Sequence, residues 1–242
     1  MSYGMKQRIL KSIYHSFDAW AADLKTACQK GCATCCTQAV TMTEVEGSYI
    51  WDYICSNSRP AWLVNRVVNL ELPLQRPLYT INEFALACLN GEESDFERGT
   101  LDQTCPFLEN NNCTIYKARP FSCRSFVSQQ TCQPGSSAVI PQYYLSAVIA
   151  VSQVIEHLSQ NQYWGNMLHI LYTILQKNGY AQITSEAGTS KIVMSQRHLL
   201  IAKPLPGFLL SDDDRPIVKP LLNRILSTVI NEKTIEQILN GE

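Results

Sequence analysis

The sequence predicts a mainly α-helical protein whose irregular, cysteine-rich metal-binding core holds at most a short β-hairpin and is packed by helices. Three observations predict this fold class. Apolar residues recur at spacings of three or four along most of the 242-residue chain, as they do on the buried face of a helix. Ten residues are cysteine, and eight of them fall into two groups. Between residues 105 and 132, proline, asparagine and cysteine are dense, and only short strand-like pieces occur.

Two helices are expected around the first cysteine group. Residues 5–27 form the first, and its apolar face is made by Ile9, Ile13, Phe17, Trp20 and Leu24. Thr43 and Glu46 form a capping box, which opens a second helix that runs to about Cys55.

Two more helices and a hairpin follow. Pro60 starts a helix over 61–72, and residues 80–89 form another before a polar segment at 90–103. Short strands are expected around 107–108 and 114–116, and the polar residues 109–112 between them indicate a turn.

After position 135 the pattern is helical. Helices are expected over 142–159 and 163–177, and the second is closed by Asn178 and Gly179. A polar loop at 184–189 and an ambiguous stretch at 191–210, interrupted by prolines, come next. Three aspartates before Arg215 and Pro216 suit a helix start, and the last helical region covers 217–239. We therefore expect a cysteine-cluster metal-binding region at 1–135 and a helical region at 136–242, packed as one unit.

Composition excludes several classes of protein. With 20 Lys+Arg against 21 Asp+Glu, the net charge of −1 gives no reason to expect a nucleic-acid partner. The chain is 45% hydrophobic and 17% charged, which indicates a globular protein, and no apolar run is long enough to span a membrane. The N-terminus lacks a long apolar segment typical of a secretory signal, so we expect a cytoplasmic protein. Thiols stay reduced there and structural disulfides are rare, so the cysteines point to metal ligation.

The eight clustered cysteines are the candidate ligands. The first group is Cys28-x3-Cys32-x2-Cys35-Cys36, and the second is Cys105-x7-Cys113-x9-Cys123-x8-Cys132. Thiolates are soft donors that suit zinc and iron–sulfur clusters. Because adjacent Cys35 and Cys36 cannot easily point the same way, they serve two centres or bridge two ions. Single Cys55 and Cys88 lie on apolar helical stretches, where buried inert thiols are expected.

These motifs resemble those of the YkgJ-type cysteine-cluster family, described as a zinc- or iron-chelating domain. The segments that carry the resemblance are the first group, Cys105-Pro106-Phe107-Leu108, and the block that runs from Cys113-Thr114-Ile115-Tyr116 through Arg119-Pro120 to Cys123-Arg124. The resemblance covers about residues 25–135 and implies a metal or iron–sulfur site built from about eight cysteines, of which Cys132 is the least closely matched. The cysteine motifs of this chain are also distantly similar to the cluster region of flagellin lysine N-methylases.

Other residues of the motif have expected roles. Pro106 and Pro120 would rigidify the turns beside the ligands. Arg119, Arg124 and Lys117 would offset thiolate charge and donate hydrogen bonds to sulfur, or the arginines would form ordinary surface salt bridges. Phe107 and Tyr116 would shield the site from water.

Three functions compete on the sequence alone. The cysteines hold an iron–sulfur cluster with a redox, sensing or structural role, they hold a purely structural zinc, or they serve an enzyme. The Cys28-x3-Cys32-x2-Cys35 spacing matches radical S-adenosylmethionine enzymes, but the motif follows a helix and no βα alternation comes after it. The likeness to lysine N-methylases leaves a cluster-dependent protein (lysine) methyltransferase open.

No other catalytic motif is present. Glycines are never closer than eight residues apart, which excludes nucleotide-binding glycine loops, and the four histidines are scattered singly. The wide, irregular spacing without histidine favours an iron–sulfur cluster, most simply [4Fe–4S], over zinc. The helical C-terminal region could recruit a protein partner; no nucleic-acid partner and no membrane span are expected.

Overall fold

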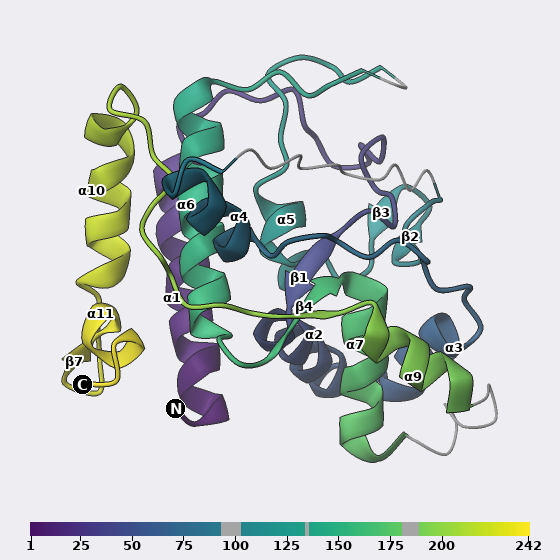
Figure 1. Ribbon diagram of the computed structural model, residues 1–242. Coiled ribbons are helices and arrows are strands. Elements are labelled where there is room, and N and C mark those ends of the chain that lie inside the picture. The colour runs from purple at the N-terminus through teal and green to yellow at the C-terminus, as the bar shows by residue number, and fades with distance from the viewer. Residues whose placement is uncertain (93–102, 134–135, 181–188) are drawn as a thin grey trace.

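The computed structural model describes residues 1–92, 103–133, 136–180 and 189–242 (Figure 1). This part of the chain is mainly α-helical, as the sequence predicts. Its helices are α1 (Tyr3–Ala21), α2 (Glu44–Ser56), α3 (Pro60–Val68), α4 (Ile81–Leu89), α5 (Phe121–Arg124), α6 (Gln142–Leu158), α7 (Met167–Leu175), α9 (Thr189–Arg197), α10 (Arg215–Leu226) and α11 (Ile235–Leu239), with a 3₁₀ turn η1 (Tyr116–Ala118) and a π turn η2 (Gln176–Tyr180). Its strands are β1 (Thr41–Thr43), β2 (Leu108–Glu109), β3 (Asn112–Cys113), β4 (Tyr163–Asn166), β5 (Leu200–Ile201), β6 (Val229–Ile230) and β7 (Lys233–Thr234).

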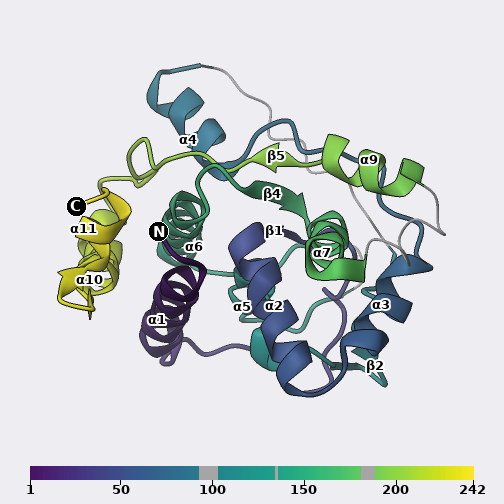
Figure 2. The same ribbon diagram turned by 90° about the horizontal axis from the view of Figure 1, so that it is seen from below.

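The helices form two groups, with a small sheet between them (Figures 1 and 2). Helices α1, α6 and α10 lie side by side and bury one apolar cluster, which includes Phe17, Val154 and Leu221. Helices α2, α3 and α7 bury the other, which includes Ile50 and Leu171. The antiparallel sheet has the order β1-β4-β5. Both clusters contain residues from before and after position 135, and no described helix is long and apolar enough to cross a membrane.

The three-stranded sheet was not predicted, and at most a hairpin was expected. Residues 163–166, which the sequence placed in a helix, pair as β4 with β1 and β5, and α7 starts only at Met167. Strands of two to four residues are too short to show an alternating pattern. The side chain of Asn166 accepts a hydrogen bond from the Leu168 backbone and so caps α7.

Helix ends also differ from the prediction. Helix α1 ends at Ala21 and α3 at Val68, earlier than expected. The predicted helical region 217–239 is broken by the β6–β7 hairpin, whose turn residues Asn231 and Glu232 have φ of 49° and 70°. The predicted hairpin is present, but its second strand is Asn112–Cys113 instead of 114–116, and its turn is only Asn110 and Asn111, at φ of 48° and 58°. Most of the predicted polar segment 90–103 (residues 93–102) and of the predicted loop 184–189 (residues 184–188) lies outside the described residues.

The buried carboxylate of Glu156 is expected to make a pH-dependent contribution to the stability of the fold. Its fully buried carboxylate accepts hydrogen bonds from the backbone of Asn82 (2.8 Å) and Lys203 (2.7 Å), and burial raises its pKa despite these donors. The folded state therefore keeps the proton to higher pH than the unfolded chain does. The contribution of Glu156 to stability is full below the pKa that it has in the unfolded chain, and it is lost as the pH rises through the pKa that it has in the folded protein.

The stability of wild type minus that of Glu156→Gln is therefore expected to grow as the pH falls from about 7 to about 5. Urea denaturation of both proteins at each pH measures this difference. A difference that stays constant or shrinks would contradict the assignment, because the amide does not titrate.

Candidate metal centre

Backbone pairing brings the two cysteine groups together. The carbonyl of Cys36 accepts a hydrogen bond from the Cys105 backbone (2.9 Å), and the Gln38 N–H donates to Gln103 (2.8 Å). Thr37 and Thr104 form a β-bridge between these contacts. The end of the first group therefore lies against the start of the second, although 68 residues separate Cys36 from Cys105.

A buried carboxylate positions Cys123. Glu46 Oε1 accepts hydrogen bonds from the Tyr14 hydroxyl (2.8 Å) and the Phe121 backbone (2.7 Å), while Oε2 accepts from the Thr43 backbone (2.8 Å). The Ser122 hydroxyl donates to the Thr41 carbonyl (2.7 Å). These contacts attach the start of α5 to α1, α2 and β1 and so hold Cys123 beside the sheet. Sequence reasoning recognised Glu46 only as a local cap, because its distant donors leave no local pattern.

Ser128 connects Cys28 with the segment that carries Cys132. The Ala27 N–H donates to the Ser128 carbonyl (2.8 Å), and the Ser128 N–H hydrogen-bonds to the Cys28 sulfur. The buried Ser128 hydroxyl accepts from the backbone of Val139 (3.1 Å). Nothing in the sequence pattern singled out this serine.

The thiols are close enough for their charges to interact. Burial raises the pKa of Cys28, its hydrogen bond from Ser128 opposes that, and charges on Cys32, Cys35 and Cys132 raise it further. Burial also raises the pKa of Cys123, to which Cys105, Cys113 and Cys35 add. All eight predicted ligands thus lie in one region, since Cys36 is likewise affected by Cys105, Cys113 and Cys123.

Cys35 and Cys36 share a hydrogen bond through their side chains. The Cys35 thiol donates to the Cys36 sulfur, which raises the pKa of Cys35 and lowers that of Cys36. Of the two thiols, Cys36 is therefore the more readily deprotonated.

Backbone donors are directed at two sulfurs of the second group. Burial raises the pKa of Cys105 and of Cys113, while the N–H of Phe107 and of Ile115, each two residues further on, hydrogen-bonds to the sulfur and opposes the increase. Such N–H···S contacts stabilise the thiolate, which is the form that ligates metal.

The thiols do not converge on one point. All ten cysteines are free, and across the described residues no set of three or more Cys, His, Asp or Glu side chains is arranged to hold a metal ion. Cys55 and Cys88, expected to be buried inert thiols, lie on α2 and α4; Cys55 is exposed and Cys88 only partly buried.

The charged residues of the motif have different roles. Arg119 lies over the Tyr116 ring (3.7 Å) and lowers the pKa of Cys113 and Cys123, against the larger effect of burial. Arg124 instead forms an ion pair with Asp18 (2.6 Å) and packs on the Tyr14 ring, as the salt-bridge alternative predicted.

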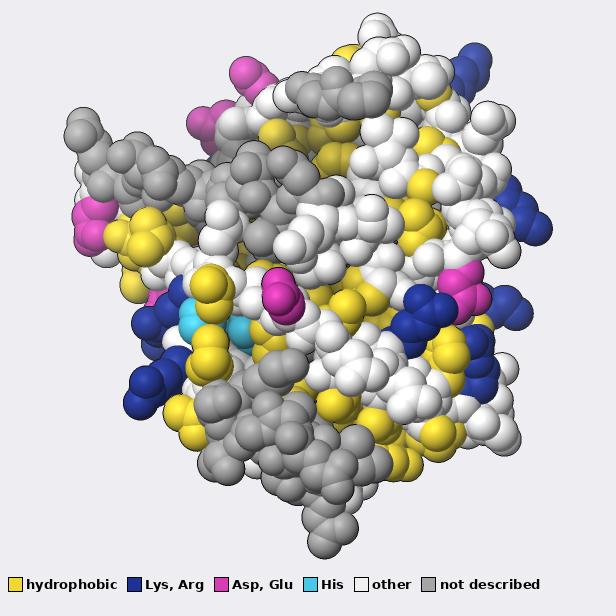
Figure 3. Space-filling model, turned by 90° about the vertical axis from the view of Figure 1, so that its right-hand side faces the viewer, with side chains coloured by type: hydrophobic (Ala, Val, Ile, Leu, Met, Phe, Trp, Pro, Cys, Tyr) yellow, Lys and Arg dark blue, Asp and Glu magenta, His cyan; other side chains and the backbone are white. Residues whose placement is uncertain are grey.

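The two aromatic residues that were expected to shield the site differ in exposure. Phe107 is fully buried, whereas Tyr116 is 60% exposed and cannot exclude water. On the face that carries α3, α9 and the β2–β3 hairpin, hydrophobic side chains, a class that includes Cys, are scattered between polar areas, with Lys and Arg toward both sides (Figure 3).

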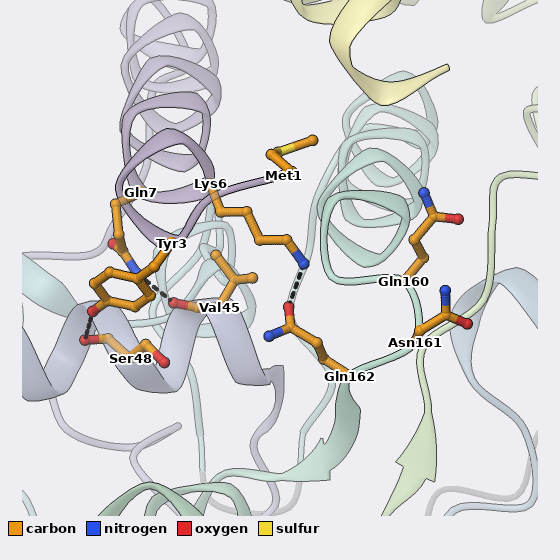
Figure 4. Close-up of a pocket in the computed structure, with 9 residues that line it drawn as sticks. All are labelled: Met1, Tyr3, Lys6, Gln7, Val45, Ser48, Gln160, Asn161 and Gln162. Atoms are coloured by element: carbon orange, nitrogen blue, oxygen red, sulfur yellow. Dashed lines mark hydrogen bonds between the residues drawn. The ribbon is translucent and has the colours of Figure 1, made fainter. Parts of the chain in front are cut away.

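A separate hollow of about 230 Å³ lies between the starts of α1 and α2 and the residues that follow α6 (Figure 4). Lys6 donates to Gln162 there (2.6 Å), and burial lowers the pKa of Lys6, an effect that Glu44 opposes. No cysteine lines this hollow, so it is not part of the candidate centre.

Comparison of the chain with protein-family models, with curated proteins and with solved structures finds no match.

Proposed function

We propose that this protein binds a metal centre through its clustered cysteine thiolates, and that the centre is an iron–sulfur cluster, most simply [4Fe–4S], with a redox, sensing or structural role in the cytoplasm. The observation that carries the proposal is the pairing of residues 36–38 with 103–105. It brings the end of the first cysteine group against the start of the second, although the two groups are distant in the sequence.

The donor set fits such a group chemically. All the candidate donors are sulfur atoms. Sulfur suits iron–sulfur clusters and zinc, and it excludes a hard cation such as magnesium as the main bound metal. The N–H donors at Cys28, Cys105 and Cys113 stabilise the thiolates. Ligation requires the thiols to turn toward common points, since they do not converge as they stand.

When bound, an iron–sulfur cluster supplies one-electron redox chemistry whose potential depends on hydrogen bonds to sulfur and on exposure. The residues of the chain set those conditions. Phe107 excludes water, Arg119 offsets thiolate charge, and the backbone of Phe107 and Ile115 donates to sulfur.

The test is elemental analysis, acid-labile sulfide and an absorption spectrum on protein purified without oxygen. A brown protein with iron and matching sulfide is expected, with the same content in Cys55→Ser and Cys88→Ser. A colourless protein that holds only zinc would overturn the iron–sulfur assignment and favour a structural metal. Absence of both metals would overturn the proposal. Added S-adenosylmethionine then tests methyl transfer to lysine: turnover would support the methyltransferase alternative.

A further inference from the structure

The hollow beside the starts of α1 and α2 carries one charged side chain. Among the described residues that line it, only Lys6 has a charged side chain at neutral pH, and Ser48, Gln160 and Asn161 are among the polar ones. The Lys6 side chain runs across the hollow from α1 and ends at Gln162, on the turn that follows α6 (Figure 4). The hollow therefore presents one ammonium group to a molecule that enters it.

Lys6 has only a neutral partner. Its Nζ donates to the amide oxygen of Gln162 (2.6 Å), and Lys6 forms no ion pair within the described part of the chain. The carboxylate of Glu44, whose charge acts on Lys6, is taken by other donors, since Oε1 pairs with Lys177 (2.6 Å) and Oε2 accepts from the Tyr163 N–H (3.3 Å). A partly buried ammonium group with a neutral partner is stabilised when an anion binds, because a hydrogen bond between charged groups is stronger than one to an amide.

The turn after α6 places neutral hydrogen-bonding groups at the same hollow. Its backbone is fixed, because the Asn161 N–H donates to the Ala202 carbonyl (3.1 Å) and the Ala202 N–H donates to the Gln162 carbonyl (2.8 Å). By contrast, the side chains of Gln160, Asn161 and Ser48 make no hydrogen bond to other described residues. These side chains are therefore available to hydroxyl and carboxylate oxygens of a ligand.

The size and the charge of the hollow limit what it can hold. Its volume of about 230 Å³ lies below the range of about 300–1,000 Å³ that is usual for pockets of drug-sized ligands, so it suits a smaller molecule. One ammonium group among neutral side chains matches one negative charge, and the nearby charge of Glu44 would repel a second. A carboxylate fits this balance better than a phosphate dianion does.

We propose that this hollow binds a small hydroxy-monocarboxylate. Its carboxylate accepts from the Lys6 ammonium group, and its hydroxyl hydrogen-bonds to the side chains of Ser48 and of the turn after α6. No cysteine lines the hollow, so the site is separate from the candidate metal centre and does not depend on which metal is bound.

The first test needs no variant and therefore no assumption about folding. Lactate and glycolate are titrated into the ¹⁵N-labelled full chain, and saturable changes are expected in the backbone N–H signals of Gln160, Asn161 and Gln162. Lactamide, the neutral counterpart of lactate, should produce none. No response to either acid, or equal affinity for lactamide, would overturn the proposal. Tighter binding of inorganic phosphate than of lactate would overturn the assignment to a monocarboxylate.

The second test removes the charge of the hollow. Lys6→Met keeps the length of the side chain and is expected to weaken lactate binding about tenfold or more, because a charge-assisted hydrogen bond is lost. Lys11→Met is the matched control and should bind as wild type does, since Lys11 is exposed on the same helix, lies over the Tyr49 ring (5.4 Å) and does not line the hollow. Unchanged binding in Lys6→Met, or an equal loss in both variants, would overturn the proposed site.

Discussion

Cys123→Ser is expected to remove the bound metal and to lower the free energy of unfolding by about 4 kcal/mol, which is the stabilisation that metal binding gives when free metal exceeds its dissociation constant about a thousandfold. Cys105 and Cys113 pack against the second apolar cluster, where a bound metal would tie β3, α5 and the segment of Cys36 together. Urea denaturation with metal analysis on the same sample measures both effects.

A chelator provides the control for this experiment. With metal removed from both proteins, wild type and Cys123→Ser should differ by less than about 1 kcal/mol, because Ser and Cys are similar in size. A difference that survives the chelator would show that Cys123 stabilises the fold by packing alone. Cys88→Ser, on α4 and outside both cysteine groups, should match wild type in metal content and stability.

Glu46→Ala is expected to destabilise the protein by about 3–5 kcal/mol, because it removes the acceptor for several buried donors at once. Tyr14, Thr43 and the Phe121 N–H would all lose their partner in a region that excludes water. The start of α5 would also lose its attachment to α1. Urea denaturation measures the loss of stability, and metal analysis shows whether Cys123 is still positioned for binding.

Glu83→Ala is the matched control. Glu83 occupies the same position in the capping box of α4, where its carboxylate accepts from the Thr80 backbone (3.0 Å) and pairs with half-exposed Lys203. Losing that local cap should cost about 1 kcal/mol. Equal losses in the two variants would contradict the role assigned to the distant donors of Glu46.

Helices with local signals were predictable. The capping box at Thr43 starts α2 where the structure has it, the helix expected over 80–89 is α4, which begins one residue later, and the periodic stretch 142–159 corresponds to α6. The sheet was not predictable, because β4 is a strand only through its pairing with β1 and β5, which are distant in the sequence.

The candidate site shows the same limit. The spacing of the cysteines predicts the candidate donors, but the way the two groups are brought together depends on the contacts of Ser128 and of residues 36–38. The motif residue Arg124 looked equally suited to a thiolate or a carboxylate partner, and only the position of Asp18 on α1 decides between them.

The mixed origin of the two apolar clusters bears on how the protein is made. All ten cysteines have been synthesised once translation reaches Cys132. Helices α6 and α7, which complete the two apolar clusters, leave the ribosome only later. At that stage of translation, α1 cannot yet pack against α6, and α2 cannot yet pack against α7. The nascent chain therefore displays ten reduced thiols with no finished core behind them, and during that interval it depends on a reducing environment to prevent wrong disulfides.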